Sequence, residues 1–267
     1  MRQRRPVRDC RPGRADQSPS NLMPLPPVLL EDDALVAFDK PAGLLLTPDQ
    51  RDRARENLAD LVRARWGTGL AAVHRIDAEG SGVMLYAKTK PALDFLSGQF
   101  QSKTVGKTSH ALTVGVPALD EYTVDFVLKE DEAQPGRMCV VKKHGHASAT
   151  GFTVLEKYPQ PAGRASFALV ECRPVTGRMH QVRVHLAASG TPILRDPVYG
   201  DETQLMLSDL KRGYKGRADE RPLLARLALH ATALTFTHPL TRERQTLAAP
   251  LPKDLEVAMK YLRKFAR

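Results

Sequence analysis

Five segments that alternate apolar and polar residues follow one another across the middle of the chain. They read HALTVGV, YTVDFVL, MCVV, GFTVLEKY and SFALVECRPV and lie between residues 110 and 175. A hydrophobic period of two residues is typical of strands with one buried face. Such a series favours an antiparallel or mixed sheet over a repeated strand–helix–strand unit. We therefore expect an α+β fold with a central mixed, mainly antiparallel sheet flanked by helices and loops.

Helical periodicity predicts three helices outside this series. Asn57 caps the first and Gly67 ends it, the second begins after Pro91, and the last is led by Asp254. Their apolar positions are Leu58, Leu61, Val62 and Trp66 in the first, Leu93, Leu96 and Phe100 in the second, and Leu255, Ala258, Met259 and Leu262 in the last.

A further helix is predicted over GRMHQVRVHLAASG, residues 177–190, with Thr176 as its cap and Gly190 at its end. This segment matters because His180 and Arg183 lie beside its apolar stripe. The stripe consists of Met179, Val182 and Leu186.

The charge balance points to a polyanionic partner. The chain has 40 Lys and Arg against 30 Asp and Glu, a formal net charge of +10. Such a surface attracts nucleic acid, which is the leading partner class. A membrane partner is not expected, because the chain has neither an apolar run near 20 residues nor a basic amphipathic anchor.

The cysteines and the two ends of the chain set the expected organisation. Cys10, Cys139 and Cys172 are scattered without a CxxC spacing, which argues against a disulfide framework or a zinc site and favours a reducing cytoplasm. Residues 1–26 are rich in arginine, proline and serine and predict a disordered basic arm, whereas residues 27–267 are expected to form one domain. Within that domain, the polar and basic residues 201–226 are expected to be an inserted surface loop.

The stretch HRIDAEGSG, residues 74–82, places an acid between an arginine and a turn of small residues. Small residues allow another molecule to approach the backbone, although a lone aspartate before glycine is also a common turn residue. A buried carboxylate stays ionised beside a cation, since an arginine within about 4–6 Å lowers a carboxyl pKa by roughly 1–3 units. Arg75 and Arg183 are the candidate partners of Asp77.

Four segments together resemble one enzyme family. HRIDAEGSGVMLYAK is close to the HRLDxxTSGLLLLAK signature of the RluA-type pseudouridine synthases, and GRMHQVRVHLAASGTPILRDPVYG is similar to their GRTHQIRVHLxxxGxPIxGDxxYG segment. EDDALVAFDKPAGLLLTP and RLALHATALTFTHPLTRERQTLAAPLP resemble the family's opening and closing segments, so that the resemblance covers roughly residues 27–252. Four ordered motifs are a far more specific signal than any one of them.

The resemblance implies that the protein isomerises uridine to pseudouridine in rRNA or tRNA, without a metal or other cofactor, and we expect a cytoplasmic monomer. Asp77 is the implied catalytic carboxylate, either as nucleophile at C1′ or as the base that removes a ribose proton, and Arg183 is its partner. Arg75 would help to hold a flipped-out nucleotide, because a stacked uridine is out of reach of an enzyme. The other candidate substrate-binding residues are His74, Ser109, Arg178, His180 and Gln181. For His74, as for His185 and His230, a hydrogen-bonded structural role is the alternative.

Three positions depart from the family pattern. Ser109 in KTSHALTVG replaces the tyrosine that stacks on the target base and aids the later proton step, and His110 would point to the opposite face of the strand. Gly80 replaces a threonine and Arg195 a glycine. Because base–aromatic stacking is worth roughly 1–3 kcal/mol, Ser109 predicts reduced activity. The alternative function is therefore a weakly active or non-catalytic RNA-binding paralogue.

Two other features are expected to be structural. His144 to His146, HGH, are interpreted as a turn rather than a metal pair, because no third ligand lies nearby in the sequence. Tyr199 in DPVYG matches the family pattern and is not expected to replace the missing tyrosine.

Overall fold

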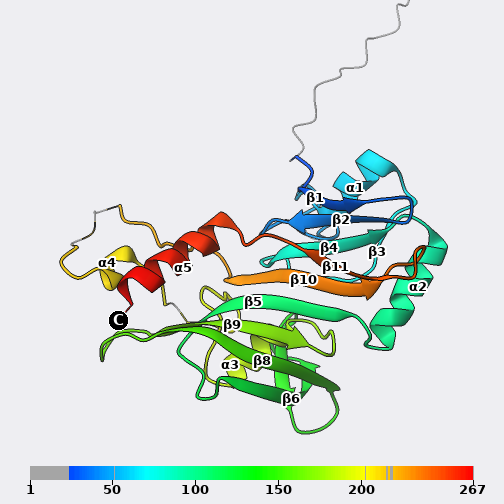
Figure 1. Cartoon of the computed structure of the whole chain (residues 1–267). Helices are drawn as coiled ribbons and strands as arrows, with labels where there is room; N and C mark the ends of the chain where they lie inside the picture. Colours follow the sequence, from blue (N-terminus) through cyan, green and yellow to red (C-terminus); the bar gives the residue numbers. More distant parts are fainter. Residues whose placement is uncertain (1–23, 51, 202, 215, 217–218, 267) are drawn as a thin grey trace, which may run out of the picture.

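One mixed sheet forms the centre of the molecule. The computed structural model describes residues 24–50, 52–201, 203–214, 216 and 219–266. Within them, an 11-stranded sheet runs in the order β1-β2-β4-β10-β5-β9-β8-β6-β7, with β11 paired to β10 and β3 paired to β4 (Figure 1). Its strand pairs are antiparallel except β4 and β10, which are parallel. The predicted α+β class and the mixed, mainly antiparallel sheet are confirmed.

The bounds of the elements follow the sequence patterns closely. The strands are β1 Val28–Glu31, β2 Leu35–Lys40, β3 Ala71–Ala72, β4 Ser81–Ala87, β5 Gly106–Val114, β6 Glu121–Glu130, β7 Met138–Val141, β8 His146–Tyr158, β9 Phe167–Pro174, β10 Leu229–Thr237 and β11 Arg244–Ala248. The helices are α1 Leu58–Trp66, α2 Lys90–Gln101, α3 Gln181–Ala188, α4 Leu207–Leu210 and α5 Lys253–Phe265. The five alternating segments correspond to β5 to β9.

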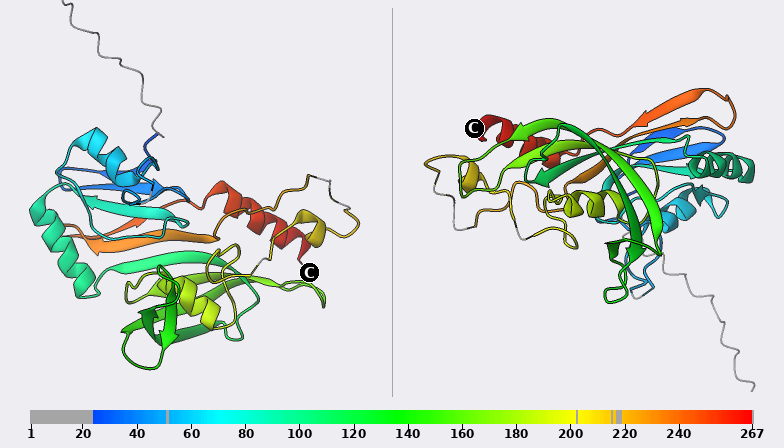
Figure 2. Two further views of the ribbon diagram at one scale, coloured as in Figure 1. Left: turned by 180° about the vertical axis from the view of Figure 1, so that it is seen from behind. Right: turned by 90° about the horizontal axis from the view of Figure 1, so that it is seen from below.

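Helices cover both faces of the sheet at its β2–β4 end. Alternate residues of β2 and β4 belong to two separate apolar clusters, one of which contains residues of α1 and the other residues of α2. All seven residues of β4 are buried for this reason, so this strand reads as a continuous apolar run rather than an alternating one. At the other end, α3 packs against β6 to β9 (Figure 2).

The predicted helix caps are confirmed at α1. The Asn57 side chain accepts a hydrogen bond from the backbone N–H of Asp60, and Gly67 follows the last turn at φ 81°. The predicted apolar positions of α5 are all buried. In α2, Leu96 is buried, whereas Leu93 and Phe100 are only partly so.

The helix predicted over residues 177–190 is wrong in its first half, since α3 begins only at Gln181. His180 lies at φ 52°, in the left-handed region, and breaks a continuous helix there. Thr176 is not a cap: its hydroxyl donates to the Gln181 side chain and accepts from the N–H of Ala149. Of the predicted stripe, only Leu186 is fully buried. Gly190, at φ 82°, follows the helix end as expected.

The surface loop predicted over residues 201–226 is also wrong in part. Its described residues include α4, and three of its leucines join the main apolar cluster that contains α5. These buried leucines are Leu205, Leu210 and Leu224. The arm predicted over residues 1–26 lies almost wholly outside the described residues.

Candidate active site

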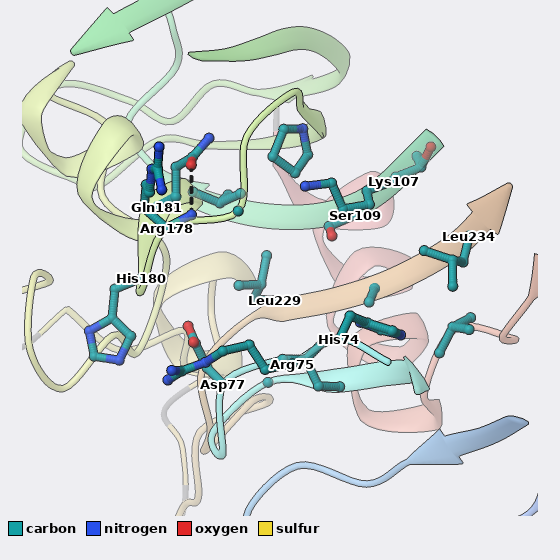
Figure 3. Close-up of a pocket in the computed structure, with 18 of the residues that line it drawn as sticks. His74, Arg75, Asp77, Lys107, Ser109, Arg178, His180, Gln181, Leu229 and Leu234 are labelled. Carbon is teal, nitrogen blue, oxygen red and sulfur yellow. Dashed lines mark hydrogen bonds between the residues drawn. The ribbon is translucent and has the colours of Figure 1, made fainter. Parts of the chain in front are cut away.

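A cavity of about 140 Å³ opens between the loop that carries Asp77 and the loop that leads into α3 (Figure 3). Its other walls come from β5 and β10. Seven of the predicted site residues line it together: His74, Arg75, Asp77, Ser109, Arg178, His180 and Gln181. Residues that are up to 107 positions apart in the chain thus share one cavity.

Arg183 lies behind the cavity, fully buried, and is held by Asp196. Its Nε and Nη2 donate to the two carboxylate oxygens of Asp196, each at 2.8 Å. Asp196 also accepts from the backbone N–H groups of Val198 and Tyr199. This bidentate pair fixes the plane of the guanidinium, which a single contact would not do.

The fixed guanidinium presents its remaining nitrogen to the cavity. Nη1 of Arg183 lies 3.3 Å from Oδ2 of Asp77 and 3.5 Å from Oε2 of Glu79. Burial alone would lower the pKa of Arg183, but Asp196, Asp77 and Glu79 outweigh it and raise that pKa. Of the two candidate arginines, Arg183 makes the contact with Asp77, and no described carboxylate forms a salt bridge with Arg75.

The backbone that carries Asp77 is tied down by Lys40. The Lys40 side chain is fully buried, and its Nζ donates to the carbonyls of Pro41, Leu44 and Ala78. Desolvation lowers the pKa of Lys40 to about 8, despite the charges of Glu79 and Asp77. Lys40 thus fixes the residue next to Asp77 through its carbonyl.

His180 and Tyr199 form a hydrogen-bonded pair beside this acid–arginine group. The Tyr199 hydroxyl accepts from the N–H of Met138 at 2.7 Å and lies 3.0 Å from Nδ1 of His180. Because its oxygen already accepts one hydrogen bond, we assign the hydroxyl as the donor and Nδ1 of His180 as the acceptor of the second. Desolvation lowers the pKa of His180, which favours the neutral ring. In that ring the proton sits on Nε2, and Nε2 is a donor.

Gln181 and His74 form hydrogen bonds to other residues of the protein. The Gln181 amide bonds to Thr176, Arg178, Ala149 and Thr150, and so fixes the loop before α3. His74 accepts from the N–H of Leu85, and burial lowers its pKa to about 4, which keeps the ring neutral.

Ser109 occupies the opposite end of the cavity. It lies on β5 with Leu229 and Leu234 of β10 facing it (Figure 3). Its hydroxyl makes no hydrogen bond with another described residue. The neighbouring His110 points to the other face, where it approaches Glu171, as the alternation of the strand predicts.

The small residues near Asp77 have two different roles. Gly82 lies at φ 115°, and a Cβ there would meet the Ala231 carbonyl oxygen at 2.1 Å, so the close approach is to the protein's own β10. A Cβ at Gly80 would meet nothing closer than 3.5 Å, which leaves room for a side chain. Arg195 lies at φ 60°, a conformation that suits the glycine of the family pattern.

Four residues of the site were not singled out from the sequence: Lys40, Glu79, Lys107 and Asp196. Asp196 is the first residue of the DPVYG segment, but only its neighbour Arg195 was named, as a departure from the family pattern. Lys40 and Lys107 could have been predicted as site residues from their positions in the family-like segments EDDALVAFDKPAGLLLTP and KTSHALTVG.

Among the described residues, no three His, Cys, Asp or Glu side chains gather as potential metal ligands. His144 lies at φ 61° in the turn between β7 and β8. None of the helices described is both long and apolar enough to cross a membrane.

Comparison with known proteins identifies the family. Residues 34–188 match the RNA pseudouridylate synthase family model. The chain is 33% identical over 240 residues to ribosomal large subunit pseudouridine synthase D of Neisseria meningitidis serogroup B, covering 88% of this chain and 61% of the relative. It is 37% identical over 241 residues to ribosomal large subunit pseudouridine synthase C of Salmonella typhi, covering 88% and 70%.

Solved structures agree with this assignment. Human RNA pseudouridylate synthase domain containing 1 superposes with a TM-score of 0.65 at 26% identity, covering 86% of each chain. The chain therefore belongs to the RNA pseudouridylate synthase family, and within it to the RluA-type group. It spans about three fifths of the length of the first of these relatives.

Proposed function

We propose that this protein isomerises uridine to pseudouridine in RNA, with Asp77 as the carboxylate that acts at the ribose. The supporting observation is the contact of Asp77 with a buried arginine that is itself immobilised by Asp196. Through this contact Arg183 orients the carboxylate of Asp77 in the cavity. Ribosomal RNA is the first substrate class to test, because the relatives are named for the large ribosomal subunit.

The reaction needs no external oxidant or group donor. The N1–C1′ bond breaks, the uracil turns, a C5–C1′ bond forms, the C5 proton is lost and N1 gains a proton. Asp77 assists the first step either by attack on C1′, where its bond to C1′ breaks again as the C5–C1′ bond forms, or by removal of a ribose proton, which it returns to the ribose as that bond forms. Both roles need an Asp77 oxygen aimed at the ribose, and the adjacent guanidinium holds the carboxylate in place.

The remaining lining residues bind the RNA. Arg75 is exposed at the mouth of the cavity, so it occupies the space left by the extruded uridine. Arg178 is exposed and attracts the phosphates. His180 donates from Nε2 to an oxygen of the target nucleotide, while Gln181 keeps the loop in place.

A non-catalytic RNA-binding role is the second candidate. The observation in its favour is Ser109, a short side chain where the family has a base-stacking tyrosine. The cavity and the basic surface would then bind a flipped nucleotide without converting it.

The test is the release of tritium from ribosomal and transfer RNA labelled at uridine C5, by the wild type and by Asp77→Asn. Asp33→Asn is the matched control, since Asp33 is an exposed aspartate outside the cavity. We expect release by the wild type and by Asp33→Asn, and a loss of at least about a thousandfold in Asp77→Asn, which corresponds to about 4 kcal/mol at 1.36 kcal/mol per tenfold.

Equal release by wild type and Asp77→Asn would refute the role of Asp77. Tight RNA binding by a wild-type protein that releases no tritium would favour the second candidate.

A further inference from the structure

A second cavity, of about 380 Å³, lies directly beside the first. Six residues line both cavities and therefore stand between them: His74, Arg75, Lys107, Thr176, Gly177 and Arg178. A hydrogen bond of 2.6 Å from Lys107 Nζ to the Thr176 carbonyl crosses this boundary and joins β5 to the loop before α3. A ligand that extends from the first cavity past this boundary would enter the second.

The lining of the second cavity has one sign of charge. It includes Arg75, Lys103, Lys107 and Arg178 but neither aspartate nor glutamate. None of these four forms a salt bridge with a carboxylate in the described part of the chain. Other surface cations do, as in the pairs of Lys88 with Glu31 and Arg173 with Glu171. Four gathered, unpaired cations repel one another unless an anion joins them.

The rest of the lining includes apolar and aromatic side chains besides Gln101 and Thr176. Phe100 stacks on His74 with ring centroids 5.4 Å apart, and Val175, which is 51% exposed, lies at the rim. Cations combined with an apolar or aromatic surface suit a nucleotide of a single strand, whose phosphate is charged and whose base is flat and apolar on its faces.

We propose that the second cavity is a subsite for a nucleotide adjacent to the target uridine, with its backbone phosphate bound by Lys103 and the cations of the shared boundary. This assignment rests on the proposed function, because the first cavity must hold the target. Lys107 has three protons and gives one to Thr176, so it can donate to this phosphate as well.

Lys103 gives the cleanest test, since it lines the second cavity but not the first and is exposed. Lys103→Gln removes its charge and keeps most of its length. Lys260→Gln is the matched control, because Lys260 is an exposed lysine on α5, which lines neither cavity. The affinity of each protein for a short single-stranded RNA is measured as a function of salt concentration.

We expect Lys103→Gln to weaken binding several-fold near 0.1 M salt and to reduce the slope of log affinity against log salt by about 0.7, the value for one phosphate contact on a single strand. Lys260→Gln should match the wild type. An unchanged salt slope for Lys103→Gln would overturn the proposal.

The position of the phosphate is tested with RNAs that carry one neutral methylphosphonate at successive positions around the target uridine. A methylphosphonate at one position beside the target should weaken RNA binding by the wild type several-fold. The same RNA should bind Lys103→Gln no more weakly than unmodified RNA does. Equal losses at all positions in both proteins would overturn the subsite, as would competition by polyglutamate as strong as by RNA. A wild type that shows these effects but releases no tritium would refute only the proposed function.

Discussion

The two ends of the cavity differ in how their polar groups are held. At the Asp77 end, Arg183 is fully buried and bonded to Asp196 through two nitrogens, and a third nitrogen faces Asp77. At the Ser109 end, a small hydroxyl faces leucines and makes no hydrogen bond with another described residue. Removing Arg183 or Asp196 at the first end takes the bidentate partner from a buried charge, whereas removing the tyrosine of the family pattern at the second end leaves no partner unsatisfied.

This difference shows why the chain can depart from the family pattern at Ser109 while Asp77 and Arg183 match it. Breaking a buried ion pair costs about 3–5 kcal/mol, a large part of the stability of a domain. Loss of an aromatic surface that meets only the substrate costs nothing in the free protein. Substitutions of Arg183 or Asp196 should therefore lower the stability of the fold, whereas substitutions of Ser109 should leave it unchanged.

Asp196→Asn should have the largest effect on the comparison. The amide retains one acceptor for Arg183 but loses the charge, so we expect about 3 kcal/mol less free energy of unfolding and a large loss of activity. Urea unfolding and tritium release measure the two effects. Asp201→Asn is the control, since Asp201 is an exposed aspartate five residues further on. A stable Asp196→Asn protein with full activity would show that the function of Asp77 does not depend on the Asp196–Arg183 pair.

Ser109→Tyr should produce an intermediate effect with the opposite sign. A restored stacking surface worth roughly 1–3 kcal/mol predicts a single-turnover rate about five- to a hundredfold higher, with little change in stability. Ser109→Leu is the control, because it adds apolar bulk without an aromatic face. If Ser109→Tyr is no faster than Ser109→Leu, base stacking does not limit this enzyme.

The strands and most helices were predictable because their signals are local. A period of two in β5 to β9 and the Asn57 cap need only neighbouring residues. The start of α3 was not predictable in this way, because the left-handed His180 and the bonds of Thr176 to Gln181 replace the expected cap. Propensity gives no sign of such side-chain bonds.

Only those site residues that lie in recognisable sequence motifs could be predicted. The resemblance marked Asp77 and Arg183, but physical reasoning alone left Arg75 as an equal partner for Asp77. Lys40 acts on Ala78, which is 38 residues away, and no local pattern in the sequence reports that contact. The second cavity arises from β5, α2 and the loop before α3, so its charge became visible only when these were brought together.

Acidification should produce the smallest effect per residue and show which groups lose their contribution to stability first. Burial lowers the pKa values of His74, His185 and His230 to about 4, from 6.5. Between about pH 6.5 and 4 the unfolded chain binds more protons at these rings than the folded one, so stability falls as the pH falls. The pKa of Asp196 is lowered by Arg183, despite its burial, and this carboxylate loses its contribution only at lower pH.

We therefore expect the free energy of unfolding to fall by about 1 kcal/mol per buried histidine between pH 6 and pH 5, measured by urea titration. His230→Gln should reduce this fall, whereas His146→Gln, at an exposed position, should not. Because the histidine rings take up protons at a higher pH than the Asp196 carboxylate, the Asp196–Arg183 pair should persist until the whole domain unfolds. A stability that is constant down to pH 4 would mean that the histidines are protonated in the folded protein, and would contradict the neutral His230 that bonds Ser81 at the start of β4.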